Sequence, residues 1–154
     1  CLRELPGVKP VFVTAALTVS TIGVPCLWSS QGVDPARLGI LVGVMFALLM
    51  GNVTLFDLRD RRADAERRIM TVPVVLGATK TRYVIAICSA LLSLALLITM
   101  DRVFSSQVHT ALAVAFVATS ICAISLVPNS SRLRYAMSVD GIPLLLGVTT
   151  LVFA

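Results

Sequence analysis

The hydrophobic positions of this chain fall into five long runs separated by short polar segments. Each run is close to the ~20 residues that a helix needs to cross ~30 Å of hydrocarbon. Backbone polar groups must be satisfied inside lipid, so such runs are expected to be helices. The pattern predicts an all-α, polytopic transmembrane bundle of about five spanning helices, with 1–154 as a single membrane domain. The predicted spans are 11–29, 37–56, 83–100, 110–127 and 139–154.

Composition agrees with a lipid environment. Hydrophobic residues make up 57% of the chain and charged residues 14%, and the mean hydropathy is +0.94. A chain this apolar cannot surround a core with polar surface, so a soluble binding module is excluded. The four cysteines lie far apart without CxxC spacing, so we expect small packing residues rather than disulfides or metal ligands. They are Cys1, Cys26, Cys88 and Cys122.

Positive charge is concentrated on one side of the predicted bundle. If the segment 57–82 is cytoplasmic, eleven of the thirteen Lys and Arg residues lie on that side and only Arg37 and Arg102 lie on the other. The positive-inside rule therefore predicts that this segment faces the cytoplasm. The net charge of +5 then belongs to the cytoplasmic rim and requires no nucleic-acid partner. The eleven residues are Arg3, Lys9, Arg59, Arg61, Arg62, Arg67, Arg68, Lys80, Arg82, Arg132 and Arg134.

Three aspartates follow the second span at helical spacing. Asp57, Asp60 and Asp64 are three and four residues apart, so on a helix their carboxylates project from one face. No helix breaker precedes them, which predicts that the span continues through them as one helix. Carboxylates at this spacing suit a divalent cation such as Mg²⁺, and the interleaved arginines could share the charge of a phosphate or diphosphate. The alternative is a solvated, positively charged loop end between two membrane helices.

Small residues form a stripe on the second span. Gly39, Gly43, Ala47 and Gly51 recur every four residues. Such a stripe allows the backbone of a neighbouring helix to approach closely. We therefore expect close helix packing along the stripe and no chemical role for these residues.

Isolated polar residues lie farther along the chain. Asp101, Arg102 and His109 fall in the external connection after the third span, where we expect His109 to be a surface residue. Tyr135 is expected to anchor the bundle at the membrane interface. Asp140 lies about one turn inside the last span, where a carboxylate is costly unless it is hydrated, paired or functional. It either faces the same cavity as the three aspartates or is hydrated at the interface, and both interpretations stay open.

The polar segment resembles a motif of a known family. DLRDRRAD at 57–64 is followed by T-x-P-V-x-L-G at 71–77, and together they resemble the second aspartate-rich motif of the UbiA-type intramembrane prenyltransferases. LPGVK at 5–9 is similar to the turn ahead of that family's fifth helix. The family pattern usually has Glu, Gly, Gly and Arg where this chain has Arg62, Ala63, Arg68 and Met70.

The resemblance implies Mg²⁺-dependent transfer of a prenyl group from an isoprenoid diphosphate to an aromatic or lipid-like acceptor. The site would lie in a prokaryotic cytoplasmic membrane, with the prenyl chain in an apolar tunnel among the helices and membrane lipid around them. The implied metal ligands are Asp57, Asp60 and Asp64, the implied diphosphate ligands are Arg59, Arg67, Lys80 and Lys9, and Asp140 is a further cavity carboxylate. The resemblance assigns no other catalytic residue.

The resemblance covers this chain as roughly the C-terminal half of a family member. The partners would then include the missing N-terminal helices of the same protein. Those helices carry the family's first motif, N-x-x-x-D-x-x-x-D, which has no counterpart in this chain. We therefore expect the isolated segment to hold half of a site.

Other functions of a membrane bundle explain the sequence less completely. A non-catalytic scaffold, or a degenerate family member without the first motif, explains the spans but not the aligned aspartates. A cation transporter would need acidic residues in the middle of several spans. A CDP-alcohol phosphotransferase would need a D-G-x-x-A-R run, which is absent from the sequence.

Overall fold

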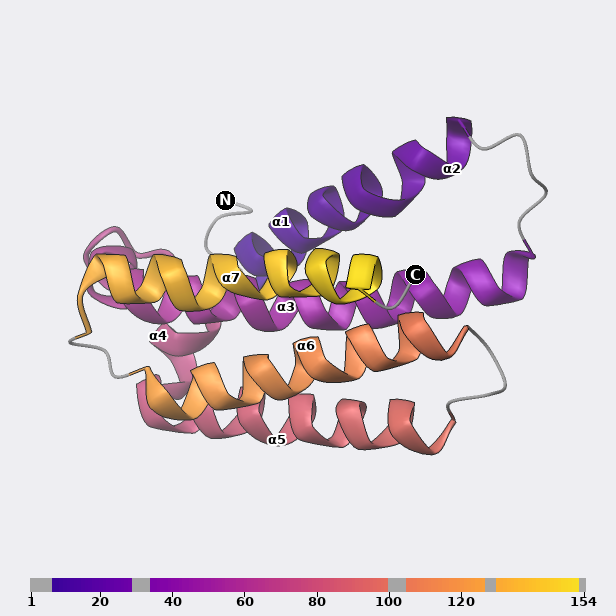
Figure 1. Cartoon of the computed structure of the whole chain (residues 1–154). Helices are drawn as coiled ribbons and strands as arrows, with labels where there is room; N and C mark the ends of the chain where they lie inside the picture. The colour runs from indigo at the N-terminus through magenta and orange to yellow at the C-terminus, as the bar shows by residue number, and fades with distance from the viewer. Residues whose placement is uncertain (1–6, 29–33, 100–104, 127–129, 153–154) are drawn as a thin grey trace.

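The protein is helical throughout the part of the chain that can be described. A computed structural model describes residues 7–28, 34–99, 105–126 and 130–152, and these ranges contain no strand. Long helices run side by side and are joined by short connections (Figure 1). The predicted all-α polytopic bundle is confirmed. Its elements are α1 (Val8–Thr18), the π-helical η2 (Val19–Gly23), α2 (Val24–Trp28), α3 (Pro35–Glu66), α4 (Val72–Leu76), α5 (Ala78–Ile98), α6 (Ser106–Ser125) and α7 (Arg132–Val152).

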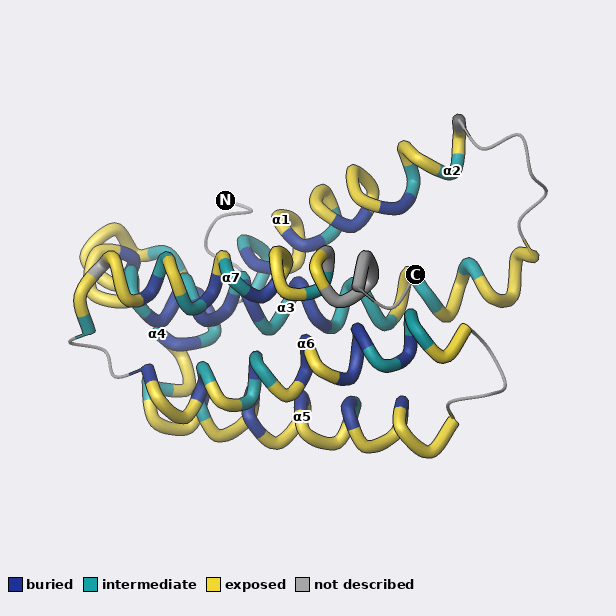
Figure 2. The backbone as a smooth tube through the Cα atoms, viewed as in Figure 1, coloured by how far each residue is buried: buried dark blue, intermediate teal, exposed yellow. Residues whose placement is uncertain are grey.

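Among the described residues, four helical segments are long and apolar enough to cross a membrane, as in an integral membrane protein. Large hydrophobic side chains cover the outside of the bundle, with Phe12 74% and Ile98 76% exposed, and the buried faces point toward the neighbouring helices (Figure 2). So much exposed apolar surface suits lipid rather than water. The four segments are Val8–Leu27, Pro35–Glu66, Ala78–Ile98 and Ser106–Ser125.

Some helices extend well beyond the predicted apolar runs. α3 continues to Glu66 instead of ending at residue 56, and α7 begins at Arg132 instead of residue 139. Hydropathy marks only the part of a helix that lies in hydrocarbon, whereas charged residues continue a helix readily outside it. The prediction that the second span runs through the aspartates as one helix is confirmed.

The first span contains a π-helical turn beside Pro25. The ring of a proline inside a helix clashes with the carbonyl four residues earlier, here that of Thr21, and proline has no N–H to donate. The wider turn of η2 ends with a bond from Val24 N–H to Val19 O, which accommodates the proline. α1 packs against α3, whereas α2 lies away from it (Figure 1).

α3 ends in a Schellman motif. Ile69 N–H donates to Asp64 O at 2.8 Å, and Arg68 N–H donates to Ala65 O at 3.1 Å. These bonds satisfy carbonyls that the helix end leaves free. Arg68 occupies the left-handed position, with φ 55°, where a Cβ costs energy and glycine is usual. The resembled family motif has glycine at this position.

The T-x-P-V-x-L-G segment forms α4 and its turn into α5. Thr71 has an extended backbone before α4, and Pro73 lies in the first turn, where a missing N–H costs nothing. Gly77 joins the two helices with φ 83°, a conformation that glycine adopts without strain. Its carbonyl accepts bonds from Thr81 N–H at 3.1 Å and Thr81 Oγ1 at 2.8 Å. The motif therefore has a clear structural role.

Polar side chains join α5 to α6 inside the bundle. Ser93 Oγ donates to Ala113 O at 3.1 Å, and Ser120 Oγ donates to Ala86 O at 3.0 Å. Arg82 Nε donates to Ala123 O at 2.9 Å and its Nη2 donates to the next carbonyl, satisfying acceptors at the end of α6. Arg82 is therefore a helix-capping residue. Hydrophobic side chains fill the rest of the interior: Leu48, Leu55, Leu58, Ile85, Leu96, Leu112, Phe116, Leu126, Val139 and Ile142.

The predicted stripe of close packing is wrong for much of its length. A Cβ added at Gly51 would lie 3.3 Å from Thr119 Cγ2 and 3.9 Å from Ile85 Cγ2, so a neighbouring helix does approach there. A Cβ added at Gly39 or Gly43 would meet nothing within 4 Å. The reason is that the helices that cover α3 converge on its second half.

Two isolated polar residues are buried rather than exposed. His109, expected at the surface, is only 1% exposed in the first turn of α6, with Nδ1 3.2 Å from Ser105 O. Tyr135, expected as an interface anchor, is 0% exposed and belongs to a hydrophobic cluster with Leu55 and Val139. Both predictions were wrong because each helix begins earlier than its apolar run. Cys26, Cys88 and Cys122 are free thiols. The predictions for Cys1, Arg3, Asp101 and Arg102 lie outside the described residues.

Candidate functional site

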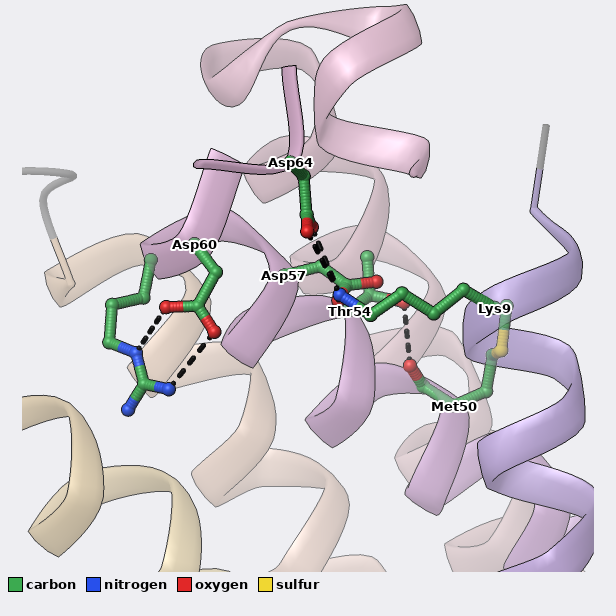
Figure 3. A network of polar contacts seen from close by, with 7 residues as sticks. Lys9, Met50, Thr54, Asp57, Asp60 and Asp64 are labelled. Carbon is green, nitrogen blue, oxygen red and sulfur yellow. Dashed lines mark hydrogen bonds and ion pairs between the residues drawn. The ribbon is translucent and has the colours of Figure 1, made fainter. Parts of the chain in front are cut away.

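Lys9 links two of the predicted metal-ligand aspartates. Its Nζ lies 3.0 Å from Asp57 Oδ1 and 3.0 Å from Asp64 Oδ2, with Asp64 Oδ1 at 3.2 Å (Figure 3). Asp57 and Asp64 are 3% and 5% exposed, whereas the Lys9 side chain is 39% exposed. Buried carboxylates are stable only when paired, so Lys9 supplies the cation that both of them need.

The turn before α1 holds Lys9 in this position. Gly7 has φ 81° and directly precedes α1, and its N–H donates to Met70 O at 3.0 Å. This bond connects the start of α1 to the segment that follows the Schellman motif of α3. Only glycine adopts such a φ without strain, which explains why the LPGVK turn has glycine at this position.

Asp60 has a different partner from the other two aspartates. Arg59 donates from Nε to Asp60 Oδ1 at 2.8 Å and from Nη2 to Asp60 Oδ2 at 3.1 Å, a two-bond pairing of guanidinium and carboxylate. The guanidinium also lies over the Phe56 ring, 5.3 Å from its centroid. The predicted row of three carboxylates is therefore divided between two cations.

The carboxylates partly fit the implied metal. Among the residues described, no group of three or more His, Cys, Asp or Glu is gathered closely enough to hold an ion. Mg²⁺, however, commonly uses one or two protein carboxylates together with substrate phosphates. Asp57 Oδ2 is buried and has no hydrogen-bond partner within the described part of the chain. Asp57 and Asp64 thus present carboxylate oxygens already arranged around a positive charge.

An elongated groove runs from these charged residues toward the middle of the bundle. Its volume is about 470 Å³, and it lies between α1 and α7, both of which pack against α3. One end is charged and the remainder is mostly apolar. The lining residues are Lys9, Val13, Leu17, Thr21, Leu49, Asn52, Val53, Phe56, Asp57, Asp60, Val139, Asp140 and Pro143.

The other predicted site residues are distributed unevenly around this groove. Asp140 lines the groove and has an exposed side chain, so it lies near the aspartates and is also accessible. Arg67 is the C-cap residue of α3, and Lys80 is in the first turn of α5. Both are exposed, and neither is among the described residues that line the groove.

Sequence reasoning missed Asn52 as a residue of this site. Asn52 lines the groove, is 5% exposed, and its Oδ1 accepts no hydrogen bond. The available signal was a single amide in an otherwise apolar helix five residues before Asp57, because an unpaired polar group inside a membrane is costly.

The chain matches no family model, no curated protein and no solved structure.

Proposed function

We propose that the intact protein transfers a prenyl group from an isoprenoid diphosphate to an aromatic or lipid-like acceptor within the membrane, with Mg²⁺ as cofactor. The observation that carries this proposal is the continuity of one groove from Lys9, Asp57 and Asp60 into an apolar body lined by Val13, Leu17 and other hydrophobic side chains. An isoprenoid diphosphate has the same division into a charged head and a long apolar chain.

The charged end offers complementary groups for a diphosphate. Lys9 and Arg59 are cationic donors that already pair with carboxylates and could exchange those partners for phosphate oxygens. Asp57 and Asp64, whose carboxylates lie around one cation, would hold Mg²⁺ together with phosphate oxygens, and Asp60 would join them once Arg59 turned to a phosphate. The ion would supply stabilisation of the negative charge on the departing diphosphate. Arg67 is exposed at the C-cap of α3 and Lys80 is exposed in the first turn of α5. From these positions they would add positive charge at this end of the bundle.

The apolar part suits a prenyl chain. Hydrophobic residues of α1, α3 and α7 line it, and the aspartates lie at one end of α3. A ligand could therefore keep its head near the membrane surface and its chain in the bundle. We place the charged end on the cytoplasmic side of a prokaryotic membrane, because the positive-inside rule and the family resemblance both favour that orientation.

A second candidate is a non-catalytic membrane scaffold or a degenerate family member. The observation that favours it is the pairing of Lys9 with Asp57 and Asp64, which satisfies two carboxylates without a metal. It gives no account of the buried, unpaired Asp57 Oδ2 or of the groove that begins beside it. We therefore favour the transferase.

The test is Mg²⁺-dependent release of diphosphate from farnesyl or geranylgeranyl diphosphate. The full-length protein, in detergent or lipid, is assayed with a panel of lipid and aromatic acceptors beside an Asp60→Asn, Asp64→Asn double variant. We expect turnover that requires Mg²⁺ and falls by at least about 100-fold in the variant, as when transition-state charge stabilisation is lost.

Asp34→Asn is the matched control, because Asp34 caps the opposite end of α3 and accepts a bond from Ala36 N–H at 3.1 Å. This variant should retain full turnover. No release by the wild-type protein, with equal diphosphate binding by the wild type and the double variant, would refute the transferase and leave the scaffold.

A further inference from the structure

The side-chain amide oxygen of Asn52, which lines the groove, makes no hydrogen bond that stabilises the described part of the fold. Asn52 belongs to the buried face of α3, and its Oδ1 is enclosed with no hydrogen-bond partner among the described residues. A buried amide that lacks a partner costs stability, and inside lipid no water replaces the missing bond. The other buried polar residue nearby, Thr54, donates to its own helix at Met50 O, 2.7 Å away, and needs no ligand.

Asn52 lies close to the charged end of the groove along α3. Five residues separate it from Asp57, which corresponds to about 7–8 Å along a helix that rises about 1.5 Å per residue. Both residues line the same groove, and the side chains around Asn52 in that groove are apolar, including Leu49, Val53 and Phe56. The amide is therefore an isolated polar group a short distance along the groove from its charged end.

We infer that Asn52 is a specificity-determining residue, whose amide oxygen accepts a hydrogen bond from a hydroxyl group of the acceptor substrate. This inference rests on the proposed prenyl transfer and narrows its acceptor to a compound with a hydroxyl donor on an apolar body. An acceptor without that donor would leave the amide unpaired, and sites with unpaired buried polar groups discriminate against such analogues.

The charged end does not serve the same purpose. Lys9 and Arg59 are donors, and the three aspartates pair with them as charged carboxylates, although Asp57 Oδ2 itself has no hydrogen-bond partner among the described residues. Of the uncharged side chains that line the groove, Thr21 donates to Leu17 O at 2.9 Å, so its hydroxyl proton is occupied within its own helix. Among the described residues that line the groove, Asn52 is thus the uncharged one whose acceptor atom is both buried and unpaired; the other such atom, Asp57 Oδ2, belongs to a carboxylate that pairs with Lys9.

The test compares hydroxyl compounds with their methyl ethers, which cannot donate. Dissociation constants for long-chain alcohols and alkylphenols, and for the corresponding ethers, are measured from the thermal stabilisation of the full-length protein in detergent. The non-hydrolysable analogue farnesyl thiodiphosphate is kept saturating. We expect the wild type to bind each alcohol about 5-fold more tightly than its ether, the effect of one net hydrogen bond.

Asn52→Leu should abolish this preference by weakening alcohol binding about 5-fold while leaving ether binding unchanged. It should also melt at the same temperature as the wild type or higher, because it removes an unsatisfied amide. Thr54→Val is the control: it removes a buried polar group from the same helix outside the groove and should keep the preference.

The inference fails if the wild type binds alcohols and ethers equally, or if Asn52→Leu keeps the preference. A lower melting temperature for Asn52→Leu alone would also overturn it, since the amide would then have a structural partner. Failure of the proposed function is distinguishable. If the wild type releases no diphosphate in the presence of Mg²⁺ but still binds alcohols more tightly than ethers through Asn52, the proposed prenyl transfer is refuted and the hydroxyl-binding site is retained.

Discussion

The two halves of α3 differ in both sequence and surroundings, since the first half is almost entirely apolar and the second half carries the aspartates. The first half, 35–47, contains Gly39 and Gly43, which have open space beside them. The second half, 48–66, contains every buried residue of the helix, including Asn52, Asp57 and Asp64. Burial along α3 therefore rises toward its second half (Figure 2). Within the second half, the neighbouring helices decide which polar residues are buried, because Asp57 and Asp64 are buried whereas Asp60, between them, is only partly buried.

The ion pairs of the second half should account for the largest effect. Lys9→Met leaves Asp57 and Asp64 buried without their cation, and breaking a buried pair costs about 3–5 kcal/mol. Because the Lys9 side chain is 39% exposed, we expect a smaller loss, about 2–3 kcal/mol of unfolding free energy. The measurement is reversible unfolding of the variant in detergent.

Addition of Mg²⁺ sharpens this prediction. If the carboxylates can hold a cation, Mg²⁺ should raise the melting temperature of Lys9→Met more than that of the wild type. Lys80→Met is the control, because it removes an exposed lysine from α5 and should change stability by less than about 0.5 kcal/mol. Equal stability of Lys9→Met and the wild type would show that the second half does not depend on this pairing.

Glycine substitutions test the contrast between the halves directly. Gly51→Leu forces a side chain against Thr119, which is already 3.3 Å from the added Cβ, so we expect a loss of about 1–3 kcal/mol from overpacking. Gly43→Leu meets open space and replaces glycine by a better helix former, so a gain of up to about 0.8 kcal/mol is expected. Thermal unfolding of both variants in one detergent gives the comparison, and similar losses at the two positions would contradict it.

Several features of this contrast could be predicted from the sequence. Apolar runs located the long helices, and the absence of a breaker before Asp57 predicted that α3 continues through the aspartates. Such features depend on local composition and helix propensity. Lys9, predicted on the same side of the membrane as the aspartates, does lie beside Asp57 and Asp64.

The contacts of the site could not be predicted in the same way. Lys9 and Asp64 are 55 residues apart in the chain. The spacing of the aspartates is a local feature and could not predict this pairing. The spacing predicted that Asp60 projects from the same face as Asp57 and Asp64. Its carboxylate, however, pairs with Arg59, whereas Lys9 pairs with the other two. The glycine stripe and His109 were misjudged for a related reason, because burial depends on which helices converge and where each begins.

A smaller effect than that of the Lys9 and Gly51 variants is expected at the end of the second half, where Arg68 adopts φ 55°. Arg68→Gly should relieve the strain of a left-handed residue, offset in part by the greater freedom of glycine in the unfolded chain. We expect a net gain of about 0.5–1 kcal/mol in unfolding free energy. Arg68→Ala is the matched control, because it removes the same charge but keeps the Cβ and its strain. If alanine stabilised the protein as much as glycine, the gain would come from removing positive charge from this arginine-rich segment, and the Schellman motif would not be strained by Arg68. If only glycine does so, the chain keeps a strained arginine four residues after Asp64 although a more stable residue fits the backbone, which would favour a role for that charge in binding an anion.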